Sequence, residues 1–61
     1  MNIQQIEIGK SYKTHVGVHA GYSPHGYEFV TAIRVIPEQF CVLVEWCDGQ
    51  KTWLYPENLF N

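Results

Sequence analysis

The sequence predicts an all-β fold, a small barrel of four to five antiparallel strands with a short 3-10 turn near the C-terminus. Short runs of β-branched and aromatic residues are bounded by Gly, Pro and Asp, as in strands joined by tight turns. Asp48-Gly49 separates two such runs and is a strong hairpin signal. Helical periodicity is absent. At this length, residues 1–61 are expected to form a single domain.

The first half of the chain predicts an arm, a strand and a long loop. Residues 1–8 carry alternating isoleucines and are expected to lie across the barrel as a short arm or strand. Gly9-Lys10 makes a turn into a β-prone stretch over residues 11–18. The Gly, Pro, Ser and His residues between positions 19 and 27 then predict a loop.

The second half predicts a long strand, a hairpin and a closing turn. Residues 28–36 form a strand with apolar side chains on both sides, and residues 37–39 turn the chain into a second strand that begins at Phe40. After the hairpin, Pro56 followed by an acidic residue fits one short helical turn. Leu59 and Phe60 are expected to plug the end of the barrel.

A two-residue loop at Asp48-Gly49 would fix the hairpin register, with Trp46 opposite Lys51 and Val44 opposite Trp53. Because side chains alternate along a strand, both faces of this hairpin would be largely apolar. One face would carry Phe40, Val42, Val44, Trp46, Trp53 and Tyr55, and the other Cys41, Leu43, Cys47, Thr52 and Leu54. A half-buried hairpin needs only one apolar face. The second face is therefore expected to be covered by the barrel, by another subunit or by a ligand.

The composition also points to apolar surface hidden by a partner, since 46% of the residues are hydrophobic and only 16% are charged. The net charge is −2, and four basic residues against six acidic ones make a poor basic patch. Nucleic-acid affinity depends on such a patch, so DNA and RNA are disfavoured as partners. No segment resembles a signal peptide or reaches the ~20 apolar residues of a membrane span. No membrane partner is therefore expected.

Cys41 and Cys47 are expected to be reduced thiols. They lie six residues apart on one predicted strand, which separates them by about 20 Å. That distance is far beyond the reach of a disulfide. Unless the two cysteines cross-link different chains, they indicate a cytoplasmic protein.

The sequence predicts neither a metal site nor a catalytic residue. His15, His19 and His25 lie close together in the chain, but structural zinc sites need four ligands at fitting spacings. Solvated loop histidines are the expectation. Cys47 adjoins Asp48, and nothing in the sequence places a general base beside the thiol, as nucleophilic catalysis would require. No cofactor is expected, and the protein is expected not to be an enzyme.

Three stretches of the chain resemble the SH3-like barrels, most closely their Tudor-like branch. They are residues 9–12 at the first strand, 44–49 at the hairpin and 55–59 at the close. Tudor-like domains hold methylated lysine or arginine in aromatic cages, and SH3 domains receive Pro-rich segments on an aromatic strip. The resemblance implies that partner binding involves Trp46, Trp53, Tyr55, Tyr22 and Tyr27, with carboxylates from Glu28, Glu45 or Glu57. Packing of the two tryptophans in the core or between subunits is the alternative.

The type II dihydrofolate reductases are also small SH3-like barrels, and they work as tetramers around one shared pore. Their last strand carries Val-Gln-Ile-Tyr-Pro, and residues 52–56 of this chain, Thr-Trp-Leu-Tyr-Pro, are similar at their end. In that family the glutamine contacts substrate and cofactor. Trp53 stands in its place here, which argues against the same activity.

The pattern therefore favours a non-enzymatic binding module that docks a protein or peptide through an aromatic surface, with Trp46 and Trp53 as anchors. Modulation of a larger partner would suit so small a protein. A nucleic-acid-associated module is the first alternative, and an oligomeric enzyme resembling type II dihydrofolate reductase is the second. A homo-oligomer is expected as readily as a monomer.

Overall fold

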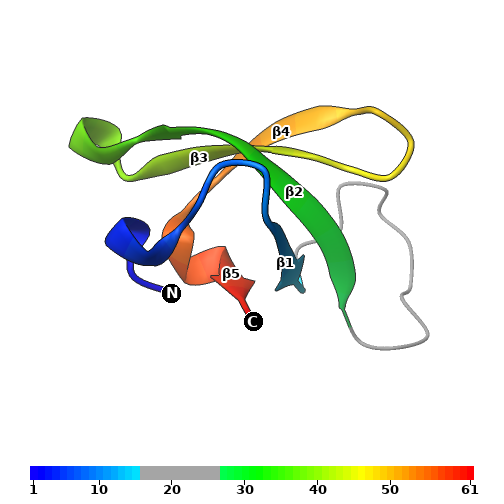
Figure 1. The fold of residues 1–61 in the computed structure, drawn as a ribbon, viewed down its shortest axis with the longest axis horizontal. Coiled ribbons are helices and arrows are strands. Elements are labelled where there is room, and N and C mark those ends of the chain that lie inside the picture. The colour runs from blue at the N-terminus through cyan, green and yellow to red at the C-terminus, as the bar shows by residue number, and fades with distance from the viewer. Residues whose placement is uncertain (16–26) are drawn as a thin grey trace.

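A computed structural model of the protein describes residues 1–15 and 27–61. The described residues form one antiparallel sheet of five strands in the order β4-β3-β2-β1-β5 (Figure 1). The strands are β1 (Ser11–Thr14), β2 (Glu28–Ile36), β3 (Cys41–Glu45), β4 (Lys51–Leu54) and β5 (Leu59–Phe60). Three 3-10 turns accompany them: η1 (Ile3–Gln5), η2 (Pro37–Gln39) and η3 (Pro56–Asn58). The predicted all-β class, the antiparallel strands and the C-terminal 3-10 turn are confirmed.

The long strand β2 connects the two halves of the sheet. It pairs with β1 on one side and with β3 on the other, and in Figure 1 it runs from the β3–β4 hairpin down towards β1 and β5. The β2–β3 register shifts between Ala32 and Arg34, which leaves Ile33 as the extra residue of a bulge. A bulge bends a strand and increases its twist. β2 is therefore bent near its middle, where its two partners diverge.

The core lies on one face of the bent sheet. Strand alternation places every second side chain there, as with Val42 and Val44 on β3. The buried apolar residues are Ile6, Tyr12, Val30, Ala32, Val42, Val44, Trp46, Leu54 and Leu59. Leu59, expected to plug the end of the barrel, reaches this core from β5, which pairs with β1. A strand of two residues was not predicted as a separate element.

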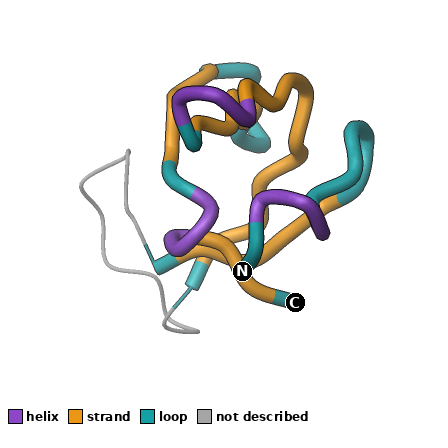
Figure 2. Tube along the Cα trace, turned by 90° about the vertical axis from the view of Figure 1, so that its left-hand side faces the viewer, coloured by secondary structure: helices purple, strands orange, loops and turns teal. Residues whose placement is uncertain are grey.

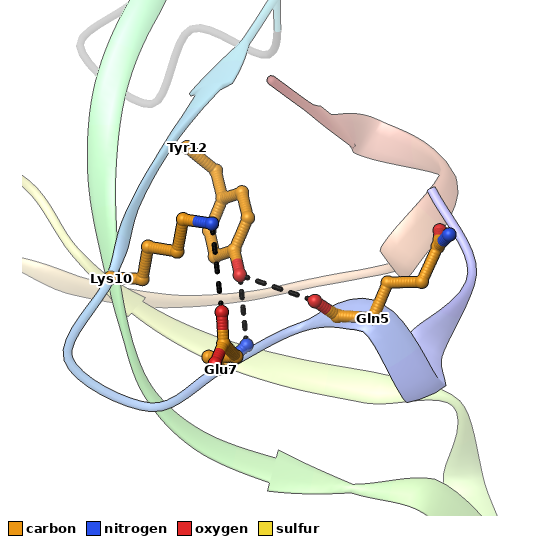
Figure 3. Close-up of polar contacts among 4 residues, drawn as sticks. All are labelled: Gln5, Glu7, Lys10 and Tyr12. Carbon is orange, nitrogen blue, oxygen red and sulfur yellow. Dashed lines mark hydrogen bonds and ion pairs between the residues drawn. The ribbon is translucent and has the colours of Figure 1, made fainter.

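The N-terminal residues form an arm that is fastened to β1 and not a strand. Asn2 caps η1 by accepting a hydrogen bond from Gln4 N at 3.3 Å. The hydroxyl of Tyr12 accepts a hydrogen bond from Glu7 N at 2.8 Å and donates one to the carbonyl of Gln5 at 3.4 Å (Figure 3). Because the Tyr12 ring is buried, these bonds hold the arm against the core.

The two ends of the described chain lie near one another, as Figures 1 and 2 both show. The amino group of Met1 donates a hydrogen bond to the carbonyl of Pro56 at 3.2 Å. The arm is therefore placed beside η3, although the two segments are at opposite ends of the sequence.

The predicted register of the β3–β4 hairpin is wrong by one residue. The observed pairs are Val42 with Leu54, Leu43 with Trp53 and Val44 with Thr52. Gly49 N donates a hydrogen bond to Trp46 O at 2.9 Å, and Trp46 N donates one to Gln50 O at 2.8 Å. Gly49 has φ +91°. These features describe a three-residue loop with a left-handed glycine, in place of the expected two-residue loop.

Asp-Gly is compatible with both kinds of loop, so the dipeptide alone does not choose the register. The one-residue slip turns β4 over relative to β3. Leu54 then faces the core opposite Val42, while Trp53 and Tyr55 point outwards. Phe40 was also expected on the same face as Val42 and Val44, but it lies outside β3 and is exposed.

Candidate functional site

Two of the large exposed apolar side chains line the same groove. Phe40 is 62% exposed and Tyr55 is 56% exposed. Both line a groove of about 300 Å³, together with Met1, Asn2, Ile3, Pro56 and Glu57. We call this the aromatic groove. Its walls come from the arm, from the junction of η2 with β3, and from the junction of β4 with η3.

Phe40 is held in a backbone conformation that costs free energy. It caps the C-terminal end of η2 with φ +52° and ψ +43°, and its N–H donates to the carbonyl of Pro37 at 3.2 Å. For a residue with a Cβ, this left-handed conformation costs about 1–2 kcal/mol. Glycine or asparagine usually occupies such caps. Since most of the Phe40 ring is exposed, burial does not offset this cost. The ring is therefore placed at the groove without a corresponding gain for the fold.

Tyr55 is fixed by backbone contacts with the turn that follows it. Its N–H donates to the side-chain oxygen of Asn58 at 3.0 Å, and its carbonyl accepts from Asn58 N at 2.9 Å. Pro56, the next residue, is buried and favours the start of the 3-10 turn, because proline presets φ. These two hydrogen bonds fix the backbone of Tyr55 at the groove.

Trp53 extends the exposed apolar surface from the groove onto the outer face of the sheet. It lies two residues before Tyr55 and is 46% exposed, so the two residues share a face at a spacing of about 7 Å. Across the sheet, Trp53 is paired with Leu43 and Leu43 with Arg34. We call Arg34, Leu43 and Trp53 the outer row. The ion pair of Lys51 with Glu45, at 3.6 Å, lies beside this row on the side of the hairpin loop.

The predicted pairing of the two tryptophans on one face does not occur. Trp46 is only 3% exposed and belongs to the core cluster, whereas Trp53 is on the outer face. The cause is the hairpin register described above. Of the predicted binding residues, the structure brings Trp53 and Tyr55 together and places Trp46 in the core. Tyr22 lies outside the described residues.

Tyr27 belongs to a different cluster, next to β1, β2 and β5. Its ring contacts Phe29 edge-on with the centroids 5.4 Å apart, and it lies 6.3 Å from Phe60. Lys13 Nζ lies 4.9 Å from the Tyr27 centroid, within the range of a cation–π contact. His15 stacks on Phe60 at 4.8 Å. None of these residues lines the aromatic groove.

The other predicted residues are distributed over the molecule. Of the three carboxylates expected near a binding groove, Glu57 lines the aromatic groove and Glu45 pairs with Lys51. Glu28 lies opposite buried Thr14. His19 and His25 lie outside the described residues. In residues 1–15 and 27–61, no three His, Cys, Asp or Glu side chains gather as metal ligands would. The same segments contain no helix with the length and hydropathy to span a membrane.

Sequence reasoning missed Phe40 and the arm as parts of a site. Phe40 follows Pro37-Glu38-Gln39 and was taken for the first residue of a strand. A phenylalanine where a 3-10 turn ends is an anomaly only once its positive φ is known. The place of Ile3 beside Pro56 depends on tertiary contacts between the two ends of the chain.

Searches against protein-family models, curated proteins and solved structures found no match for this chain.

Proposed function

We propose that this protein is a non-enzymatic binding module that docks a protein or peptide segment in the aromatic groove. The observation that carries the proposal is Phe40, a large aromatic residue that is strained in its backbone and mostly exposed. Backbone strain that the fold does not need is concentrated at functional sites in proteins. Here the strained residue lies beside a second exposed ring, Tyr55, across a groove.

The chemistry of the groove suits a peptide side chain. Aromatic residues dominate the energetics of protein interfaces, because they bury a large area with few rotatable bonds. A volume of about 300 Å³ is at the lower end for ligand pockets. It would accommodate one or two apolar side chains of a partner. Trp53 would then contact the residues of the partner that continue from the groove onto the sheet.

The number of strands and the closing 3-10 turn support an SH3-like barrel as the finer description of the fold. The five antiparallel strands and the 3-10 turn immediately before β5 match the pattern that the sequence resemblance implies. We place the protein in the cytoplasm, since Cys41 and Cys47 are free thiols. Neither inference identifies the partner.

The test is a selection of binding peptides from a random-peptide display library, with the purified protein as bait. Selected peptides should lose affinity by about tenfold or more in Phe40→Gly and in Tyr55→Ala, because each change removes an aromatic contact. Phe40→Gly keeps the left-handed cap, so its loss of binding would not reflect unfolding. Phe29→Ala is the matched control, since Phe29 is 57% exposed but lies outside the groove.

Affinities that stay within about twofold in both groove variants would refute the proposal. Equal losses in Phe29→Ala would refute it as well. Sedimentation of the same variants tests a further alternative, namely that a second copy of the chain covers the groove. If wild type is a dimer that dissociates only in Phe40→Gly and Tyr55→Ala, the occupant of the groove is a second copy of the chain and not a peptide.

A further inference from the structure

Arg34 is the basic side chain at one end of the outer row. It is exposed on β2 and lies directly opposite Leu43, which lies directly opposite Trp53. Directly opposed residues on one face have Cβ atoms about 5 Å apart. The three side chains therefore form a continuous strip across β2, β3 and β4, apolar at one end and cationic at the other.

Arg34 differs from the other basic residues in having no partner among the described residues. Lys10 pairs with Glu7 at 3.5 Å, and Lys51 pairs with Glu45 at 3.6 Å. Lys13 lies over the Tyr27 ring. No ion pair or ring contact is found for Arg34 within residues 1–15 and 27–61. Glu45, the carboxylate on the outer face of β3, is already paired with Lys51.

We propose that Arg34 selects a carboxylate in the segment that occupies the aromatic groove. This inference rests on the proposed function and names the chemistry of the partner: an apolar anchor followed by an aspartate or glutamate. A guanidinium matches a carboxylate through two parallel hydrogen bonds, which makes the pair specific as well as attractive. Leu43 and Trp53 reduce the access of water to one side of the pair, and Coulomb attraction is stronger where water is excluded.

The geometry also predicts where the acidic residue lies in the partner. Trp53 on β4 and Tyr55, in the extended residue just after β4, are about 7 Å apart, and Arg34 lies two strands, or about 10 Å, from Trp53. An extended segment advances about 3.3 Å per residue. The carboxylate should therefore be about three or four residues from the side chain that fills the groove. None of the three residues of the outer row is acidic, and Glu45, which lies beside the row, is paired with Lys51 at 3.6 Å.

The experiment repeats the peptide selection with wild type, Arg34→Glu and Lys10→Glu as baits. Both substitutions make the same change in net charge, but the Lys10 ammonium group pairs with Glu7 beside the Tyr12 ring (Figure 3) and is not part of the outer row. Wild type and Lys10→Glu should enrich Asp or Glu at a fixed distance from the apolar anchor. Arg34→Glu should enrich Lys or Arg at that same position. A peptide selected on wild type should bind Arg34→Glu about tenfold more weakly or worse.

The outcomes separate this inference from the proposed function. Peptides that depend on Phe40 and Tyr55 but show no acidic preference, or keep the same preference on Arg34→Glu, would overturn the role of Arg34 alone. Peptides that depend on neither ring would overturn both. Thermal unfolding confirms that each bait is folded, and Arg34→Gln replaces Arg34→Glu if the latter is not. The Arg34→Gln variant should lose the preference for acidic residues in the peptide without reversing it. If no peptide is selected and single-stranded oligothymidine binds to wild type but not to Arg34→Glu, the partner is a nucleic acid. That result would overturn the inference.

Discussion

The two faces of the β3–β4 hairpin are similar in composition and opposite in role. On the inner face, Val42, Val44, Trp46 and Leu54 are buried in the core. On the outer face, Trp53 and Tyr55 remain about half exposed. Both faces carry large apolar residues, so hydrophobicity does not distinguish them. The length of the hairpin loop, three residues in place of two, puts the two tryptophans on opposite faces. Trp46 therefore stabilises the fold, and Trp53 remains available to a partner.

Substitution of the two tryptophans gives the largest expected contrast. Trp46→Ala removes a fully buried indole and should lower the free energy of unfolding by about 3–5 kcal/mol. The whole stability of a domain of this size is about 3–9 kcal/mol, so much of the protein should unfold. Trp53→Ala should cost about 1 kcal/mol or less, because its ring is half exposed. Urea titration followed by circular dichroism measures both, and the reverse order would contradict the structure.

The hydroxyl of Tyr12 gives the next largest effect. Tyr12→Phe leaves Glu7 N without its hydrogen-bond acceptor and should cost about 1–2 kcal/mol. Tyr55→Phe is the control on the outer face, and it should change stability by no more than about 0.5 kcal/mol. The midpoints of urea unfolding at equal slopes report the difference. Equal costs for the two tyrosines would mean that the arm is not held to the core through Tyr12.

The hairpin loop offers a direct test of the register. Asp48→Gly should lower stability by about 0.5–1 kcal/mol, because Gln50 N loses the Asp48 carboxylate as acceptor and the unfolded chain gains freedom. In a two-residue type I′ loop, position 48 would have positive φ and glycine would be favourable there. The sign of the change in thermal unfolding therefore distinguishes the two loops. An Asp48→Gly variant that is more stable than wild type would instead support the two-residue loop and the register expected from the sequence.

Phe40 should show the smallest effect, with the opposite sign. Phe40→Gly should raise the free energy of unfolding by up to about 1 kcal/mol, because glycine adopts the left-handed cap without strain and little ring burial is lost. Phe40→Ala keeps the strain and should show no such gain. Both are measured by urea unfolding. If Phe40→Gly were clearly less stable than wild type, the ring would serve the fold, and the main support for the aromatic groove would be lost.

The parts of the fold that local sequence determines were predictable. The bounds of β2 follow from an unbroken β-prone run that ends at Pro37, and Pro56 marks η3. The loop type at Asp48-Gly49 was not predictable, because the same dipeptide fits two registers and only packing of Leu54 against the core separates them. Strand β5 is too short to have a pattern of its own.

The candidate site was only partly predictable for a related reason. Trp53 and Tyr55 could be named because the hairpin carries more apolar surface than one buried face needs, and because the resemblance to SH3-like barrels implies a role for its aromatic residues. Phe40 depends on a left-handed φ that the sequence does not reveal, and Ile3 reaches the groove through contacts between distant segments. Arg34 could be placed beside Trp53 only after the register of both strand pairs was known.

The two tryptophans also provide the most direct test of the whole account, since each gives one indole N–H signal in a nitrogen–proton NMR spectrum. A library-selected peptide is titrated into labelled protein while both signals are followed. We expect the Trp53 signal to move with increasing peptide and the Trp46 signal, from the core, to stay in place. A peptide that shifts Trp46 and leaves Trp53 unchanged would contradict the assignment of the inner face to folding and the outer face to docking.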